Sequence, residues 1–173
     1  MPTLIIVAGP NGAGKTSFAN QYLPSLKQHF VYLNADEIGR GLRAMPDVVG
    51  SVDVRAARRM LIEIEQAISD GDNVMIETTL ANRTYAARIV DWRRLGYGVA
   101  LVYLRLPTAE KAIERVRRRV AAGGHHIPDD VVRRRFSKSL DYLENLYKPL
   151  VDEWYVWASE EGRFTPLAAW DDK

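Results

Sequence analysis

Residues Gly9 to Thr16 have the types and the spacing needed to bind a polyphosphate. They read Gly-Pro-Asn-Gly-Ala-Gly-Lys-Thr, match the pattern G-x-x-x-x-G-K-[ST], and directly follow the apolar run 4–8. Glycines let the backbone turn tightly and point its N–H groups at phosphate oxygens. In such a loop we expect Lys15 to reach the β- and γ-phosphates of ATP and Thr16 to ligate Mg²⁺. The expected cofactor-binding residues are Gly9, Pro10, Asn11, Gly12, Ala13, Gly14, Lys15, Thr16 and Ser17. The alternative is a glycine-rich turn with an exposed lysine.

Two carboxylates, Asp36 and Glu77, follow other apolar runs. Asp36 could accept the proton of a substrate hydroxyl during phosphoryl transfer, or it could hold Mg²⁺ through water. The alternative is that Asp36 caps a short helix starting near Glu37. An unpaired Glu77 facing a phosphate would be repelled, so we expect a metal ion or a substrate hydroxyl beside it. Its alternative is a solvated side chain at a strand end.

The stretch 115–135 is rich in arginine on both sides of a Gly-Gly turn. Helical spacing places Arg115 and Arg119 on one face, with Arg118 pointing elsewhere. Part of such a run is ordinarily a solvated surface. The order of helix, glycine break and second helix also fits a lid that folds over the nucleotide and brings arginines to the transferring phosphoryl group. The arginines concerned are Arg115, Arg117, Arg118, Arg119, Arg133, Arg134 and Arg135.

The rest of the chain alternates apolar runs with stretches of helical spacing, which predicts an α/β fold with a parallel sheet of five strands flanked by helices. The expected strands are 4–8, 30–33, 74–76, 99–106 and 154–158. The expected helices are one ending before Pro24 and those over 52–70, 84–95, 108–121 and 130–147. Ligands of open α/β sheets bind beyond the carboxyl ends of the strands. The polar clusters 9–17, 34–37 and 77–83 should therefore converge, with Arg83 among the candidate substrate contacts.

Length and composition limit the possible classes of protein. The 173 residues, 47% of them apolar, suit one domain over 1–173. Neither a membrane-length apolar run nor a charged leader is present, so we expect a cytoplasmic protein without a membrane partner. The chain lacks cysteine, and adjacent His125 and His126 make a poor zinc site, which leaves Mg²⁺ as the expected metal. A net charge of +2 is too small for strong non-specific attraction to nucleic acid.

Taken together, the motifs resemble the zeta toxin family, specifically its short bacterial branch, from residue 3 to about 157. Besides the glycine-rich loop, the likeness rests on Leu-Asn-Ala-Asp-Glu-Ile at 33–38, Glu-Thr-Thr-Leu at 77–80, Gly-Gly-His-His-Ile-Pro at 123–128 and Arg-Arg-Arg-Phe at 133–136. The lid turn at 123–128 departs from the lid of the best-studied toxins. The resemblance implies the fold of P-loop kinases, a UDP-N-acetylglucosamine kinase activity and a possible antitoxin partner.

The same resemblance implies roles for individual residues. Lys15 and Thr16 would bind ATP and Mg²⁺, and Asp36 would be the base that activates the sugar hydroxyl. Glu77 and Thr79 would contact substrate or metal. The lid arginines would be Arg115 or Arg119, together with Arg134 or Arg135.

The function that we predict is transfer of the ATP γ-phosphoryl group to a hydroxyl of a small acceptor, with Asp36 taking the proton. We expect the segment 39–50 to form part of the acceptor pocket. Two alternatives stay open, namely an ATP-binding regulatory switch without an acceptor and a kinase of nucleic-acid ends. Aromatic residues for base stacking are missing around 115–135, which speaks against the second.

Overall fold

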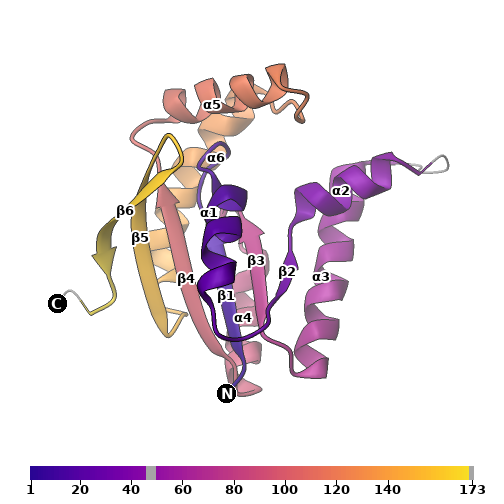
Figure 1. Ribbon diagram of the computed structural model, residues 1–173, viewed down its shortest axis with the longest axis vertical. Coiled ribbons are helices and arrows are strands. Elements are labelled where there is room, and N and C mark those ends of the chain that lie inside the picture. The colour runs from indigo at the N-terminus through magenta and orange to yellow at the C-terminus, as the bar shows by residue number, and fades with distance from the viewer. Residues whose placement is uncertain (46–49, 172–173) are drawn as a thin grey trace.

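A six-stranded sheet forms the centre of the computed structural model, which describes residues 1–45 and 50–171 (Figure 1). Its strand order is β2-β3-β1-β4-β5-β6, with parallel pairing from β2 to β5 and antiparallel pairing between β5 and β6. The strands are β1 Thr3–Ala8, β2 Val31–Leu33, β3 Val74–Thr78, β4 Gly98–Arg105, β5 Glu153–Glu160 and β6 Arg163–Ala169. The predicted α/β class with a parallel sheet is therefore confirmed.

The strand β6 corrects the prediction of five strands. It pairs with β5 at the edge of the sheet, and its pairing shifts register between Val156 and Trp157, where Pro166 lies opposite. Proline cannot donate a ladder hydrogen bond and is tolerated in sheets at edges and bulges. A largely exposed strand containing proline shows no clean alternation, so the sequence pattern did not reveal it.

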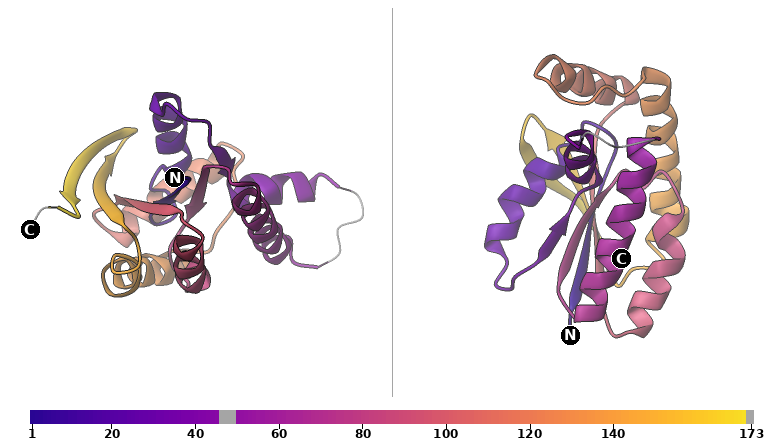
Figure 2. Two further views of the ribbon diagram at one scale, coloured as in Figure 1. Left: turned by 90° about the horizontal axis from the view of Figure 1, so that it is seen from below. Right: turned by 90° about the vertical axis from the view of Figure 1, so that its right-hand side faces the viewer.

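The helices lie on both faces of the sheet (Figure 2). They are α1 Lys15–Tyr22, α2 Ala35–Arg43, α3 Val52–Asp70, α4 Thr84–Arg94, α5 Ala109–Ala121 and α6 Asp129–Tyr142, with a 3₁₀ turn η1 at Leu23–Ser25 and a π-helical turn η2 at Leu143–Tyr147. The predicted helix over 130–147 is thus α6 continued by η2. Part of the predicted acceptor segment 39–50, residues 46–49, lies outside the described residues.

Two hydrophobic cores, one on each face, hold the layers together. Alternate residues of β1 enter different cores: Leu4 and Ile6 pack with α3, α4 and η2, whereas Ile5 and Val7 pack with α1 and α5. This alternation follows from the pleat, which sends successive side chains of a strand to opposite faces. Each face of β1 is buried, which explains why its sequence is a continuous apolar run.

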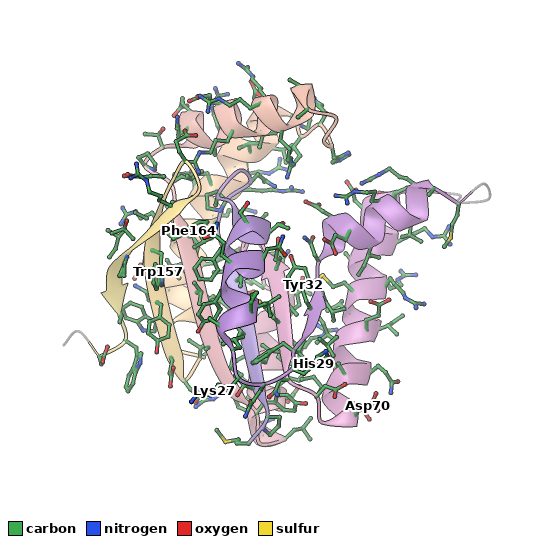
Figure 3. The ribbon with its side chains drawn as sticks, viewed as in Figure 1. Lys27, His29, Tyr32, Asp70, Trp157 and Phe164 are labelled. Atoms are coloured by element: carbon green, nitrogen blue, oxygen red, sulfur yellow. The ribbon has the colours of Figure 1, made fainter. Side chains whose placement is uncertain are left out.

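The aromatic residues near the carboxyl end join these cores from the side of β5. Trp154 and Trp157 are partly buried against the two cores, whereas Trp170 is 43% exposed. Trp157 and Phe164 lie on the hairpin formed by β5 and β6 (Figure 3). Both rings contact Phe18 of α1 edge to face, with centroid distances of 5.9 and 5.2 Å. The hairpin β5–β6 therefore supports the start of α1. Within residues 1–45 and 50–171, no helix combines the length and the apolar character that crossing a membrane requires.

Candidate active site

The loop 9–14 connects β1 to α1 and lies tightly against β4 and α5. A Cβ atom at Gly9 would be 2.5 Å from the carbonyl oxygen of Leu104, and one at Gly12 would be 2.9 Å from Cβ of Arg115. Both glycines have positive φ, 145° and 80°, which other residues rarely adopt. The loop opens directly into the amino end of α1, where unpaired N–H groups favour an anion. This is the geometry of a phosphate-binding loop.

Lys15 closes this loop with its own side chain. Its Nζ atom donates hydrogen bonds to the carbonyl oxygens of Gly9 and Pro10, at 3.0 and 3.1 Å. Burial of the ammonium group lowers the pKa of Lys15. A polyphosphate entering the loop would offer this ammonium group charged oxygens in place of neutral carbonyls.

Four charged side chains act on Lys15 from different elements. The carboxylates of Glu77 and Asp36 raise the pKa of Lys15, whereas Arg119 and Arg135 lower it, and the larger effect of burial leaves the pKa lowered. All four are candidates chosen from the sequence, Arg135 as one of the lid arginines. The polar clusters after β1, β2 and β3 therefore converge at the carboxyl edge of the sheet, as predicted.

Glu77 is paired with Thr16 and is buried. Thr16 Oγ1 donates to Glu77 Oε2 at 3.1 Å, and Glu77 is only 8% exposed, so the alternative of a solvated side chain is wrong. Burial raises the pKa of Glu77, against the opposing effects of hydrogen bonds from Tyr32 and Thr16 and of the charge of Lys15.

The Thr16–Glu77 pair also fits the expected magnesium ion. Hydroxyl and carboxylate oxygens suit Mg²⁺, which takes few protein ligands and completes its shell with water and phosphate. Within the described part of the chain, no group of three or more acidic or histidine side chains is arranged to hold a metal. The role of Thr16 and Glu77 in holding Mg²⁺ stays a prediction.

Asp36 lies in the first turn of α2, but it is not the cap of that helix. The cap is Asn34, whose Oδ1 accepts the backbone N–H of Asp36 at 2.9 Å, so the interpretation of Asp36 as a cap is wrong. The Asp36 side chain is 67% exposed, and its Oδ2 lies 3.8 Å from a guanidinium nitrogen of Arg119 on α5. This contact brings the two sides of the sheet's carboxyl edge together, with α2 on one side and α5 on the other (Figure 1).

The two predicted lid arginines of α5 have different surroundings. Arg115 donates to the carbonyl of Gly12 at 3.3 Å and to the hydroxyl and carbonyl of Ser159 at 3.1 Å each. Its guanidinium group thus ties the phosphate-binding loop to β5. Arg119 reaches Asp36 instead, and its buried Nε atom has no hydrogen-bond partner within the described ranges. Catalytic roles for both arginines stay predictions.

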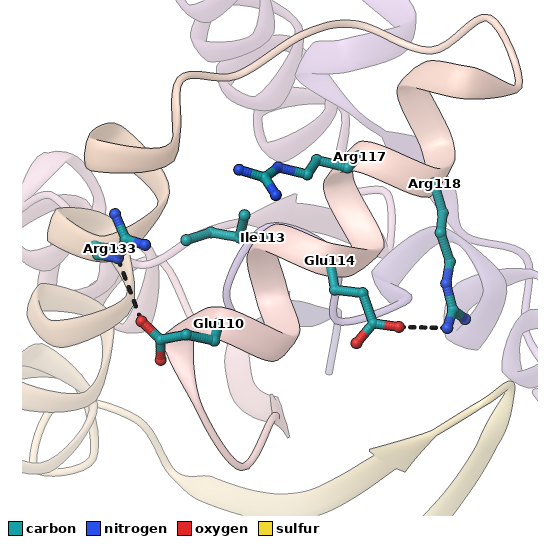
Figure 4. A pocket seen from close by; sticks show the side chains of 6 residues that line it. All are labelled: Glu110, Ile113, Glu114, Arg117, Arg118 and Arg133. Atoms are coloured by element: carbon teal, nitrogen blue, oxygen red, sulfur yellow. Dashed lines mark hydrogen bonds and ion pairs between the residues drawn. The ribbon is translucent and has the colours of Figure 1, made fainter.

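Most of the remaining arginines of 115–135 form surface ion pairs. Figure 4 shows a pocket between α5 and α6, in which Arg133 contacts Glu110 at 3.3 Å and Arg118 contacts Glu114. Arg117 pairs with Asp129. The arginines that line this pocket are thus paired with nearby carboxylates, and none of them is among the charged groups that shift the pKa of Lys15. Arg134 is exposed, and its predicted catalytic role stays a prediction.

Two further candidates, Thr79 and Arg83, contact α6. The Thr79 carbonyl accepts a hydrogen bond of 2.6 Å from Ser139, a buried residue of that helix. The guanidinium carbon of Arg83 lies 5.5 Å from the ring centroid of Tyr142. Their roles as substrate contacts stay predictions.

One residue of the site, Tyr32, was missed by the sequence analysis. Tyr32 lies on β2 (Figure 3). Its hydroxyl forms a hydrogen bond with Glu77 Oε1, and Asn34 Nδ2 lies 3.4 Å from the same hydroxyl. A signal was present, since Tyr32 and Asn34 are two apart and share one face of a strand. The sequence could not show that this strand lies beside the one ending in Glu77.

The sheet order, the phosphate-binding loop and the helices over the carboxyl edge define a P-loop protein of the kinase-like type. The model of the family described as "AAA domain" matches residues 4–146, and the chain belongs to this family. Among curated proteins, an uncharacterized protein of Haemophilus influenzae is 27% identical over 132 residues, which are 76% of this chain and 91% of the relative.

Three solved structures show how widely this fold is used. A chain of the PezAT chromosomal toxin–antitoxin system of Streptococcus pneumoniae aligns with a TM-score of 0.72 at 17% identity, covering 100% of this chain and 73% of its own. A chain of the Pnkp1/Rnl/Hen1 RNA repair complex gives 0.67 at 18% identity, with 96% and 48% covered. A gluconokinase of Sinorhizobium meliloti gives 0.52 at 20% identity, with 92% and 84% covered. The resemblance to toxin kinases is thus confirmed at the level of the fold.

Proposed function

We propose that this protein is an ATP-dependent kinase that transfers the γ-phosphoryl group to a hydroxyl of a small acceptor. The observation that carries the proposal is the position of Asp36. Asp36 follows β2 at the carboxyl edge of the sheet, and its side chain does not cap α2, because Asn34 does so. It lies 3.8 Å from Arg119, and both charges act on Lys15. The gluconokinase among the similar structures supports a phosphotransferase, and the toxin–antitoxin structure supports the kinase-like class.

The chemistry assigns one step to each residue. Asp36 accepts the proton of the acceptor hydroxyl, whose oxygen then bonds to the γ-phosphorus while the bond from that phosphorus to the β–γ bridging oxygen breaks and ADP leaves. Lys15 and the loop amides hold the β- and γ-phosphates, and Arg119 neutralises charge that develops on the transferring group. Mg²⁺, held by Thr16 and Glu77, would supply charge neutralisation between the phosphates.

The acceptor that we propose is anionic and nucleotide-linked. Three positive side chains meet at the site, those of Lys15, Arg119 and Arg135. They outnumber the two carboxylates, Glu77 and Asp36, so the site favours an anion. UDP-N-acetylglucosamine is the first candidate, because the sequence resembles the zeta toxins. We further propose that the protein acts in the cytoplasm and that an antitoxin protein is its partner, for which the PezAT structure gives support.

The test is to incubate the protein with Mg²⁺ and ATP labelled at the γ-phosphate, together with a panel of UDP-sugars and other nucleotide metabolites. We expect labelled phosphate on one acceptor, and Lys15→Ala should abolish the labelling while leaving the circular dichroism spectrum unchanged. Release of free phosphate with no labelled acceptor would instead identify a regulatory ATPase and overturn the proposal.

A kinase of nucleic-acid ends is a second candidate, favoured by the structural likeness to a chain of an RNA repair complex. Against it, Arg117, Arg118 and Arg133 are each engaged with a neighbouring carboxylate and are not free for phosphates of a strand. An oligonucleotide with a 5′-hydroxyl end belongs in the same panel. Its labelling, with strong sensitivity to salt, would select this candidate.

A further inference from the structure

We propose that Tyr32 is a positioning residue of the nucleotide and magnesium site, where its hydroxyl fixes the carboxylate of Glu77 against Thr16. The inference deepens the proposed function, on which its biological meaning rests. It assigns a role to a side chain that neither the phosphate-binding motif nor the polar clusters of the sequence include. The register of two strands and a chain of hydrogen bonds place the Tyr32 hydroxyl against Glu77.

The register of β2 and β3 brings the three polar side chains together. Tyr32 pairs with Met75 and Leu33 pairs with Ile76, so the next residue of each strand, Asn34 and Glu77, follows at the same level. Because side chains alternate along a strand, Tyr32 and Asn34 share the face on which Glu77 lies. The core on this face contains Tyr32 and Met75 together with Phe18 of α1, the helix that begins beside Thr16.

Four hydrogen bonds connect the group. The Tyr32 hydroxyl bonds to Glu77 Oε1, while Thr16 Oγ1 donates to Glu77 Oε2 at 3.1 Å. Asn34 Nδ2 completes the ring, with 3.3 Å to Thr16 Oγ1 and 3.4 Å to the Tyr32 hydroxyl. Each oxygen of the Glu77 carboxylate is thus held by a different hydroxyl, which leaves the group one orientation.

This arrangement is what a magnesium site needs from its surroundings. Mg²⁺ demands near-ideal octahedral geometry, and groups that orient its ligands are worth about 10- to 100-fold in metal affinity. A hydroxyl that donates its proton to a carboxylate keeps a lone pair for a metal, which is the state of Thr16 here.

The variant Tyr32→Phe removes the hydroxyl and keeps the ring that packs in the core. Two measurements test its role. Electron paramagnetic resonance measures binding of Mn²⁺, a spectroscopic substitute for Mg²⁺, to the protein saturated with ATP, and calorimetry measures binding of ATP in excess chelator. We expect about 10-fold weaker binding of Mn²⁺ and an unchanged affinity for metal-free ATP. The control Tyr22→Phe removes a hydroxyl from the last residue of α1, at the opposite end of that helix from Thr16, and should change neither value.

A second variant keeps the test decisive if Tyr32→Phe fails to fold. Asn34→Ser retains an oxygen that can cap α2 and removes the amide that contacts Thr16 and Tyr32, so it should also weaken Mn²⁺ binding. Unchanged Mn²⁺ affinity in a folded variant would overturn the proposal, and so would an equal loss of ATP affinity with and without metal. A protein that shows the Tyr32 effect but labels no acceptor would refute the kinase function and leave this inference standing.

Discussion

At the scale of single residues, Asp36 has the freedom that a general base requires. Asn34 caps the start of α2, so the Asp36 side chain is not needed there. The Asp36 carboxylate lies 3.8 Å from Arg119 and is 67% exposed. An exposed ion pair of this kind contributes about 0–1 kcal/mol to stability. Its removal should therefore affect chemistry far more than folding.

We predict that Asp36→Asn lowers kcat by about 10²- to 10⁴-fold, because the amide cannot accept the proton of the acceptor hydroxyl. The melting temperature should stay within a few degrees of the wild-type value. The measurement is transfer of labelled phosphate, followed alongside thermal unfolding. Glu37→Gln, which removes an exposed carboxylate from the adjacent position, should keep its activity. Undiminished turnover in Asp36→Asn would exclude Asp36 as the base.

Residue types and strand ends were enough to predict that Lys15, Asp36 and Glu77 converge. Each follows a recognisable apolar strand, and parallel strands end at a common edge. The role of Tyr32 could not be predicted in this way, since it depends on which strands are neighbours and on their register. Nor could the sequence separate Arg115 from Arg119. Both share a helix face, and only the closeness of Gly12 shows that Arg115 turns toward the loop.

At the scale of elements, the phosphate-binding loop is clamped between α5 and β5. Arg115 reaches from α5 to Gly12 and Ser159, and the Ser159 hydroxyl donates to the carbonyl of Ala13 at 2.6 Å. Ser159 is 2% exposed, so these hydrogen bonds are shielded from water. The loop amides are therefore held in place by helix α5, which also carries Arg119. A movement of α5 would shift the amides that bind the phosphates.

We predict that Gly12→Ala disturbs this clamp. The added Cβ would lie 2.9 Å from Cβ of Arg115 and 3.0 Å from the carbonyl of Ala112, at a φ of 80°. Strain and overlap together should lower the free energy of unfolding by about 1–3 kcal/mol, as read from the urea midpoint. Calorimetry should show weaker ATP binding, because α5 and the loop are forced apart.

The matched control is Gly41→Ala, in the interior of α2. A Cβ at Gly41 meets nothing within 4 Å in the part of the chain that the structure describes, and its φ is not in the positive range. Alanine should therefore stabilise this helix by up to about 1 kcal/mol. If Gly12→Ala were as stable as Gly41→Ala and bound ATP normally, the loop would not be clamped as described.

Elements differed in how well the sequence predicted them, for reasons that lie in their environments. The strands β1 and β4 are buried in the sheet, and their apolar runs identified them to within a residue or two. β6 has one neighbour and mostly exposed side chains, so tertiary pairing with β5 and not local pattern decides its structure. The turn η2 could not be predicted from local pattern either. The apolar spacing continues through it, whereas its hydrogen bonding changes from α-helical to π-helical.

At the scale of the whole molecule, buried hydroxyl groups link the core to the site. Tyr103 of β4 is fully buried and its hydroxyl lies 2.8 Å from that of Ser139, which in turn donates to Thr79 after β3. Leu80 follows with a φ of 60° and no exposure, an uncommon conformation for a residue other than glycine. The turn that carries Thr79 is therefore held by packing and by α6, and its shape depends on the integrity of the core.

Two buried tyrosines, Tyr85 and Tyr103, make the free energy of unfolding fall at alkaline pH. Burial raises the pKa of both Tyr85 and Tyr103 to about 12, above the value of about 10 in an unfolded chain. In the window between these values the folded state binds more protons than the unfolded state, so the free energy of unfolding falls as pH rises. From these two groups we predict no effect on the free energy of unfolding below about pH 10 and a loss of roughly 2–3 kcal/mol for each group by about pH 12.

Urea unfolding at a series of pH values, with phenolate absorbance recorded in parallel, measures this limit. Tyr85→Phe isolates one group, because the Tyr85 hydroxyl has only the Met60 sulfur, at 3.8 Å, as a hydrogen-bond partner among the described residues. The variant should lose less stability between pH 10 and 12 than the wild type, by roughly the share of one tyrosine. An identical slope in both proteins would mean that the Tyr85 phenol ionises freely in the folded state. That result would contradict the close packing of α4 on β1 and β4, which buries this side chain.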